Sequence, residues 1–133
     1  MLKFVYIAIG GAMGSVLRYL VSGWVYRVTS ETFPWGTLAV NIAGCFVIGF
    51  LWALAERVVF SAGARAFVFT GVLGGFTTFS TFGLETFNLL RDGEAGYGLG
   101  NVVGSTVAGI AAVFAGFAAC RLLLGIISAG EAT

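Results

Sequence analysis

The sequence contains no histidine, one proline and two cysteines, and only 10% of its 133 residues are charged. Without histidine the chain lacks the commonest metal ligand and the commonest general base at neutral pH, which argues against an enzyme. The formal net charge is +1, so no basic face for a nucleic-acid partner can be drawn. Cys45 and Cys120 lack the spacing of a zinc motif and are interpreted as small packing residues.

Apolar side chains, by contrast, make up 59% of the chain, and its mean hydropathy is +1.00. A membrane span needs about 20 predominantly apolar residues. The sequence offers such stretches at 4–25, 36–55, 66–90 and 98–127. The first could also be a secretory signal, but its apolar pattern continues through Arg18 to Val25. Because little remains for a soluble domain, we predict one all-α transmembrane domain of four helices over residues 1–133.

The distribution of basic residues gives only a weak bias toward one orientation in the membrane. Four spans place both termini on one side, and lysine and arginine bias sets which side is cytoplasmic. The terminal side would carry Lys3, Arg57, Arg65 and Arg121, and the opposite side Arg27 and Arg91. This small difference is compatible with insertion in both orientations.

The third span carries its most polar segment, GGFTTFSTFGLET over 74–86, at its own centre. Glycine costs about 1 kcal/mol relative to alanine in a helix, and serine and threonine hydroxyls compete for backbone groups. We therefore predict a break near 74–78, in a place buried in protein or facing water. A break exposes carbonyl oxygens, which bind cations, and amide groups, which favour anions.

Phe79 and Phe82 lie three residues apart just after this predicted break, so both rings project from one helix face. The edge of an aromatic ring is electropositive, so two such edges along a narrow polar path could contact a small dehydrated anion. Ordinary packing is the alternative. Glu85 follows on nearly the same face, where a carboxylate is either functional or neutral and hydrogen-bonded.

Polar residues also occur inside the other spans. Arg18 either snorkels to an interface or draws anions toward an aqueous vestibule. Asn41 either forms a hydrogen bond across helices or lines a polar path. Asn101 and Ser105 lie four residues apart among small residues, which suits a tight helix interface, a polar track, or both.

Glycines spaced along the first two spans predict close approach of neighbouring helices. The first span has Gly10 and Gly14 on one helix face, and the second has Gly44 and Gly49. We expect other helices to pack against these positions.

The segments GGAMGSVLRY, GTLAVN and GGFTTFSTF, together with the four-span length, resemble the Fluc (CrcB) family of small bacterial fluoride channels. The resemblance covers essentially the whole chain. It implies a multi-pass protein of the bacterial inner membrane that exports fluoride passively and protects the cell from fluoride toxicity. It also implies a homodimer of two antiparallel subunits, with two fluoride pores and a structural sodium ion at the dimer centre. The weak charge bias fits this dual topology.

The resemblance also implies roles for particular residues. It places the fluoride pore at Arg18, Thr37, Asn41, Phe79, Phe82, Glu85 and Ser105. The backbone carbonyls of Gly74 and Thr77 would bind the sodium ion. Asn101 and Gly109 stand where some relatives carry a tyrosine and a second serine, so the far end of the fluoride path departs from the family pattern.

The main alternative is a proton-coupled exporter of the small multidrug-resistance kind, which also forms antiparallel dimers of four-helix subunits. Such exporters are typically built around a glutamate in the first helix, but the first span here has no acidic residue. Glu85 is the only acid in the middle of a span. A third option, an assembly or anchoring protein without transport, leaves the polar centre of the third span unexplained.

Overall fold

All the regular secondary structure is helical in the parts described by a computed structural model, residues 1–29 and 32–130, with side chains described up to 125. No strand occurs in these ranges. Four helical segments are long and apolar enough to cross a membrane: Leu2–Val28, Trp35–Ala55, Ala62–Arg91 and Ala95–Gly125. The predicted all-α fold with four spans is confirmed, and the chain is a multi-pass membrane protein.

Three of the spans are single continuous helices, whereas the third is assembled from shorter pieces. The continuous helices are α1 (Leu2–Val28), α2 (Trp35–Ala55) and α6 (Ala95–Gly130). The third span consists of α3 (Ala62–Arg65), the π-helix η1 (Ala66–Leu73), α4 (Gly74–Phe76) and α5 (Phe79–Arg91).

Local sequence signals explain where several helices begin and end. Pro34 precedes the first turn of α2, where its missing N–H is not needed. The side chain of Ser61 caps α3 by accepting a hydrogen bond of 3.1 Å from the Ala64 amide. Between α5 and α6, Gly93 has a φ of 84°, a left-handed conformation that suits glycine at a helix end.

The helical run of the third span stops at Phe76 and resumes at Phe79. Thr77 and Thr78 between them are extended, with ψ angles of 158° and 121°. The sequence favours a break that begins at the two glycines, but Gly74 and Gly75 are helical. Gly75 instead permits close packing, because a Cβ there would lie 2.6 Å from the carbonyl oxygen of Gly11 on α1.

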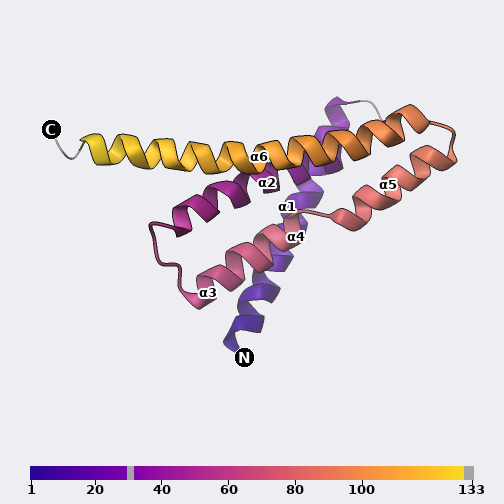
Figure 1. The fold of residues 1–133 in the computed structure, drawn as a ribbon. Helices are drawn as coiled ribbons and strands as arrows, with labels where there is room; N and C mark the ends of the chain where they lie inside the picture. Colours follow the sequence, from indigo (N-terminus) through magenta and orange to yellow (C-terminus); the bar gives the residue numbers. More distant parts are fainter. Residues whose placement is uncertain (30–31, 131–133) are drawn as a thin grey trace.

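The helices form an open arrangement around this interruption (Figure 1). Helix α6 runs across the molecule with α2 packed along it, while α1 packs against η1, α4 and α2. Beyond the interruption the chain leaves α1 and continues into α5, and α6 then runs back beside α5. The two extended residues therefore lie near the point where α1, α2 and the third span meet.

Glycines allow the backbones of α1 and η1 to come close together, as predicted. A Cβ at Gly10 would lie 2.5 Å from the Phe67 carbonyl oxygen, and one at Gly14 would overlap the Val72 carbonyl. The same holds on α2, where a Cβ at Gly49 would overlap the carbonyl of Val113 on α6. No larger residue fits these positions without moving a helix.

Little of the apolar surface is buried within one chain. In the most apolar 18-residue stretch of each span, only 11% to 22% of the residues are buried. The largest fully buried side chains among the described residues are Val40, Asn101 and Cys120. Cys120 and Cys45 are both free, in agreement with their interpretation as packing residues. Lipid, other protein or both must cover the rest of the apolar surface.

Candidate functional site

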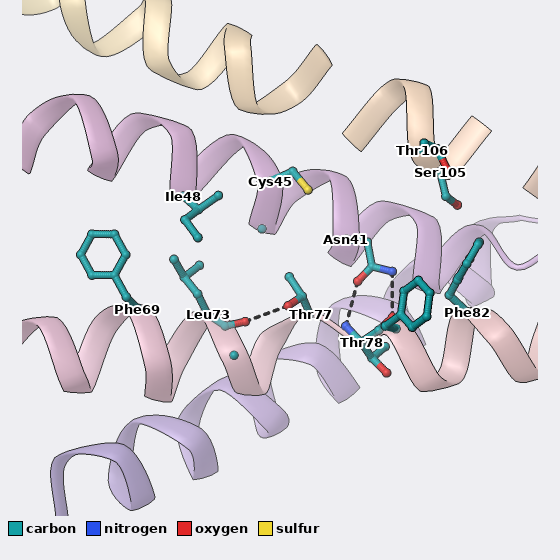
Figure 2. A pocket seen from close by; sticks show the side chains of 13 residues that line it. Asn41, Cys45, Ile48, Phe69, Leu73, Thr77, Thr78, Phe82, Ser105 and Thr106 are labelled. Carbon is teal, nitrogen blue, oxygen red and sulfur yellow. Dashed lines mark hydrogen bonds between the residues drawn. The ribbon is translucent and has the colours of Figure 1, made fainter. Parts of the chain in front are cut away.

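Three cavities lie along the third span, at its interruption and beyond it toward the end of α5. The largest, about 410 Å³, is here called the central cavity (Figure 2). It is bounded by α2, by the third span on both sides of the interruption, and by α6. Its polar lining includes Asn41, Thr77, Thr78, Ser105 and Thr106.

The side chain of Asn41 holds the interruption in place. Its Nδ2 donates a hydrogen bond of 3.0 Å to the Thr78 carbonyl, and its Oδ1 accepts one of 2.8 Å from the Thr78 amide (Figure 2). Thr78 in turn begins α5, because its Oγ1 accepts a hydrogen bond from the Thr81 amide. The hydrogen bond across helices that the sequence allows for Asn41 is therefore present, and Asn41 also lines the central cavity.

These same bonds free two backbone carbonyls for a ligand. In a continuous helix the amides of Thr78 and Thr81 would donate to the carbonyls of Gly74 and Thr77. Here they donate to Asn41 Oδ1 and Thr78 Oγ1 instead. Carbonyl oxygens without their helical donors are suitable ligands for a hard cation. No cluster of three or more acidic, cysteine or histidine side chains that could hold a metal occurs in 1–29 or 32–125.

Two phenylalanine rings lie side by side at the start of α5, where both line the central cavity. The ring centroids of Phe79 and Phe82 are 5.4 Å apart, with an interplanar angle of 43°. Phe82 is half-buried, whereas 83% of Phe79 is exposed. The two rings thus share one face, as their spacing predicts, and one of them projects out of the subunit.

A directed chain of hydrogen bonds links α6 to α5. Ser105 Oγ donates to Asn101 Oδ1 at 3.2 Å, and Asn101 Nδ2 donates to Thr86 Oγ1 at 2.9 Å. Thr86 Oγ1 donates to the Phe82 carbonyl at 2.8 Å. Asn101 is only 1% exposed, so it fastens the two helices and does not face the cavity. The hydroxyl hydrogen of Ser105 is used within this chain, so in this state Ser105 presents lone pairs to the central cavity.

A second cavity of about 340 Å³, here called the arginine cavity, lies on the other side of the interruption. Arg18 supplies its cationic side chain. Glu85 also lines it and is hydrogen-bonded: Glu85 Oε1 accepts 2.8 Å and 3.1 Å bonds from the hydroxyls of Thr37 and Tyr26. The other oxygen, Oε2, is buried without a hydrogen-bond partner.

A third cavity of about 330 Å³, here called the acidic cavity, lies beyond Glu85 toward the end of α5. Its lining includes Asn88 and the acidic residues Asp92 and Glu94. Asp92 contacts the Arg91 side chain at 3.0 Å, but that pair is exposed and adjacent in sequence. Such an exposed surface pair adds little stability.

The cavities follow one another along the third span. Thr78 lines both the central and the arginine cavity, and Tyr26 and Glu85 line both the arginine and the acidic cavity. The Thr78 backbone is held by Asn41, whereas Glu85 is held by Tyr26. The first boundary is thus one residue held by Asn41, and the second is a hydrogen-bonded pair.

The predicted pore and sodium-binding residues divide between the central cavity and the arginine cavity. Those lining the central cavity are Asn41, Phe79, Phe82, Ser105, Gly74 and Thr77. Those lining the arginine cavity are Arg18, Thr37 and Glu85.

Two residues at the cavity boundaries have roles that sequence reasoning did not assign. Tyr26 lies near the end of a span, where a tyrosine ordinarily indicates an interfacial anchor, so nothing local connects it to Glu85. Thr78 belongs to the polar segment, but its position at the boundary follows from the partner that Asn41 supplies. Thr81 lines the arginine cavity as well, so two of the three hydroxyls that follow Thr77 face a cavity there.

Comparison with known proteins identifies relatives over most of the chain. Residues 5–117 match the family described as CrcB-like protein, Camphor Resistance (CrcB). A protein of Opitutus terrae is 56% identical over 116 residues, which cover 85% of this chain and 88% of the relative. Proteins of Parabacteroides distasonis and Salinibacter ruber are 51% and 47% identical, covering 87% and 94% of this chain and 91% and 94% of theirs. All three are named Fluoride-specific ion channel FluC.

Proposed function

Because the chain belongs to the CrcB family, we propose that it is a fluoride-selective channel through which fluoride leaves the bacterial cell passively. Such export protects the cell from fluoride toxicity, and the protein acts as a channel and not as an enzyme. The observation that carries the proposal is the central cavity, where Asn41, Phe79 and Phe82 meet at an interruption inside a span. Relatives named as fluoride-specific channels over nearly the whole length support the same function.

A fluoride pore must replace the tightly held hydration shell of the ion with protein donors. The amide nitrogen of Asn41 carries two hydrogens, and only one is used on the Thr78 carbonyl. The other is available to an anion in the cavity that Asn41 lines. The electropositive edges of Phe79 and Phe82 add weak contacts to a dehydrated anion. Rings and small residues around this path also exclude larger anions by size.

The arginine cavity is suited to attract the anion before it is dehydrated. Arg18 places a permanent positive charge beside a path lined with hydroxyl groups. Thr37 lies at the same cavity, but its hydroxyl hydrogen is used on Glu85. We therefore assign Arg18 the attraction of the anion, and Thr37 the fixing of the Glu85 carboxyl.

The channel is proposed to work as an antiparallel homodimer in the lipid membrane. Phe79 supports this, because a ring that is 83% exposed lines a closed path only if another surface lies opposite. The low burial of every span also supports a second subunit that covers part of the apolar surface. The six lysine and arginine residues at the loops and termini divide only four to two between the two sides, which is compatible with insertion in both orientations.

A structural sodium ion at the dimer centre fits the chemistry of this chain. The carbonyls of Gly74 and Thr77 would hold it, since their helical donors are engaged with Asn41 and Thr78. Oxygen ligands of this kind suit a small hard cation. When bound, the ion supplies fixed positive charge near the fluoride path. We expect purified protein to lose dimers, measured by crosslinking, when sodium is replaced by N-methylglucamine; unchanged crosslinking would contradict a structural ion.

Fluoride and chloride efflux from proteoliposomes, measured with and without a proton gradient, tests the proposed function. We expect fast fluoride efflux that is indifferent to the gradient, with chloride retained. Efflux that requires the gradient would instead support the proton-coupled exporter, which neither the relatives' names nor the acid-free first span favours. Absence of fluoride efflux would refute the channel.

A further inference from the structure

The arginine cavity and the acidic cavity share one pair of lining residues, and the place where they meet is here called the junction. Of all the side chains that the structure describes, only those of Tyr26 and Glu85 line both cavities. They are joined by a hydrogen bond of 3.1 Å from the tyrosine hydroxyl to Glu85 Oε1. This hydrogen-bonded pair therefore lies where the two cavities meet.

The tyrosine ring is fixed in place by the start of α2. Its Cε2 lies against Gly36, where any Cβ would overlap the ring. The next residue, Thr37, supplies the second hydrogen bond to the same Glu85 oxygen. Helices α1 and α2 thus each provide one donor to a carboxyl group carried by α5.

The two oxygens of this carboxyl group are in different situations. Glu85 Oε1 accepts both hydrogen bonds, whereas Oε2 is buried and has no partner. Because Oε2 has almost no exposed surface, water in the two cavities does not reach it. Both hydroxyl donors therefore bond to Oε1, whereas Oε2, which has no donor, is buried.

We propose that Tyr26 is a positioning residue that holds the Glu85 carboxyl in this orientation and thereby keeps the junction passable for the anion. The inference rests on the proposed function and adds a residue outside the predicted pore. An uncovered carboxylate in the passage repels an anion. Loss of the tyrosine hydroxyl leaves Glu85 with one donor and lets Oε2 rotate toward water in the acidic cavity.

The test uses the full-length protein in proteoliposomes, with fluoride efflux as the first readout. Tyr26→Phe keeps the ring against Gly36 and removes only the donor. We expect efflux to fall about tenfold, since the loss of one hydrogen-bond partner at a buried group costs on the order of that factor. Replacement of Tyr26 by 4-aminophenylalanine, which restores an N–H donor on the same ring, should recover efflux to within about twofold. Tyr97→Phe on α6, where the tyrosine lies outside the cavities, is the matched control.

A second readout does not depend on transport. In protein labelled with ¹³C-glutamate, the carboxyl resonance of Glu85 is assigned by its loss in Glu85→Gln. We expect Tyr26→Phe to shift this resonance and 4-aminophenylalanine to move it back. A ring that served packing alone would leave the resonance in place.

The outcomes separate this inference from the proposed function. If the unmodified protein passes no fluoride, the channel proposal fails and the role of Tyr26 in anion passage fails with it. If the unmodified protein conducts and Tyr26→Phe conducts equally well, only the positioning role is overturned. It is also overturned if Tyr26→Phe and 4-aminophenylalanine are equally impaired, because the donor would then not matter.

Discussion

Asn41 pairs with the backbone of Thr78 in the way that a neighbouring β-strand would. Its amide donates to the Thr78 carbonyl at 3.0 Å and its carbonyl accepts from the Thr78 amide at 2.8 Å. An extended residue inside a membrane span leaves its polar backbone groups without helical partners, and in lipid each such group costs several kcal/mol. One side chain of α2 therefore stabilises the interruption and also faces the cavity beside it.

Asn41→Asp should reduce fluoride efflux to less than about a tenth of the unmodified rate. The substitution removes the donor to the Thr78 carbonyl, and a lost hydrogen bond at a buried group costs about 1–3 kcal/mol. It also places a negative charge on the anion path. Efflux from proteoliposomes measures the effect, and crosslinking of purified protein checks that dimers still form. Unchanged efflux would exclude Asn41 from the pore.

Phe82→Ile should reduce fluoride efflux at least about tenfold, because isoleucine fills similar space but has no electropositive ring edge. The matched control is Phe114→Ile on α6, where the ring is 72% exposed and lines none of the three cavities. Both variants should form dimers to the same extent. Equal efflux from Phe82→Ile and the control would show that ring edges do not contribute.

Gly116→Ala should destabilise the fold by about 1–3 kcal/mol, as expected when a well-packed contact is overfilled. A Cβ at Gly116 would overlap the Phe46 carbonyl where α6 packs on α2. Gly104→Ala on the same helix is the control, since nothing lies within 4 Å of a Cβ there. That control should be neutral or more stable by about 0.5–1 kcal/mol. Thermal unfolding in detergent distinguishes the two; equal stabilities would contradict the packing of α2 on α6.

Asn101→Leu should destabilise the protein by about 1 kcal/mol, the usual scale of a hydrogen bond between membrane helices. The amide links Ser105 to Thr86 and is nearly inaccessible. Thr106→Val is the control, because its hydroxyl bonds only to the Val102 carbonyl of its own helix. Denaturation in detergent should show a loss for the first variant and little change for the second. The reverse order would mean that the chain of bonds does not fasten α5 to α6.

Features that depend on local composition were accessible from the sequence. The number of spans, the all-α fold and the close approach at Gly10 and Gly14 all follow from hydropathy and side-chain size. The polar centre of the third span also stood out, because glycines and hydroxyls disfavour a helix wherever they occur. The resemblance to the CrcB family also rests on short sequence motifs, which can be recognised without the tertiary structure.

The position of the interruption and the use of its groups were decided by the tertiary structure. Gly74 and Gly75 stay helical against α1, and the chain extends at Thr77 and Thr78, because Asn41, 37 residues from Thr78, supplies the missing hydrogen-bond partners. Pairs this far apart have no signature in local composition.

The sequence by itself thus determined a four-helix membrane protein with a polar defect in its third span, because both depend on transfer of side chains and backbone from water to lipid. Only the tertiary structure decided which groups the defect leaves free. It turned the Ser105 hydrogen toward Asn101, and it brought Tyr26 to Glu85 across 59 residues. The physical reason is that each donor hydrogen forms one hydrogen bond. The packing of helices that are distant in sequence determines which acceptor it meets.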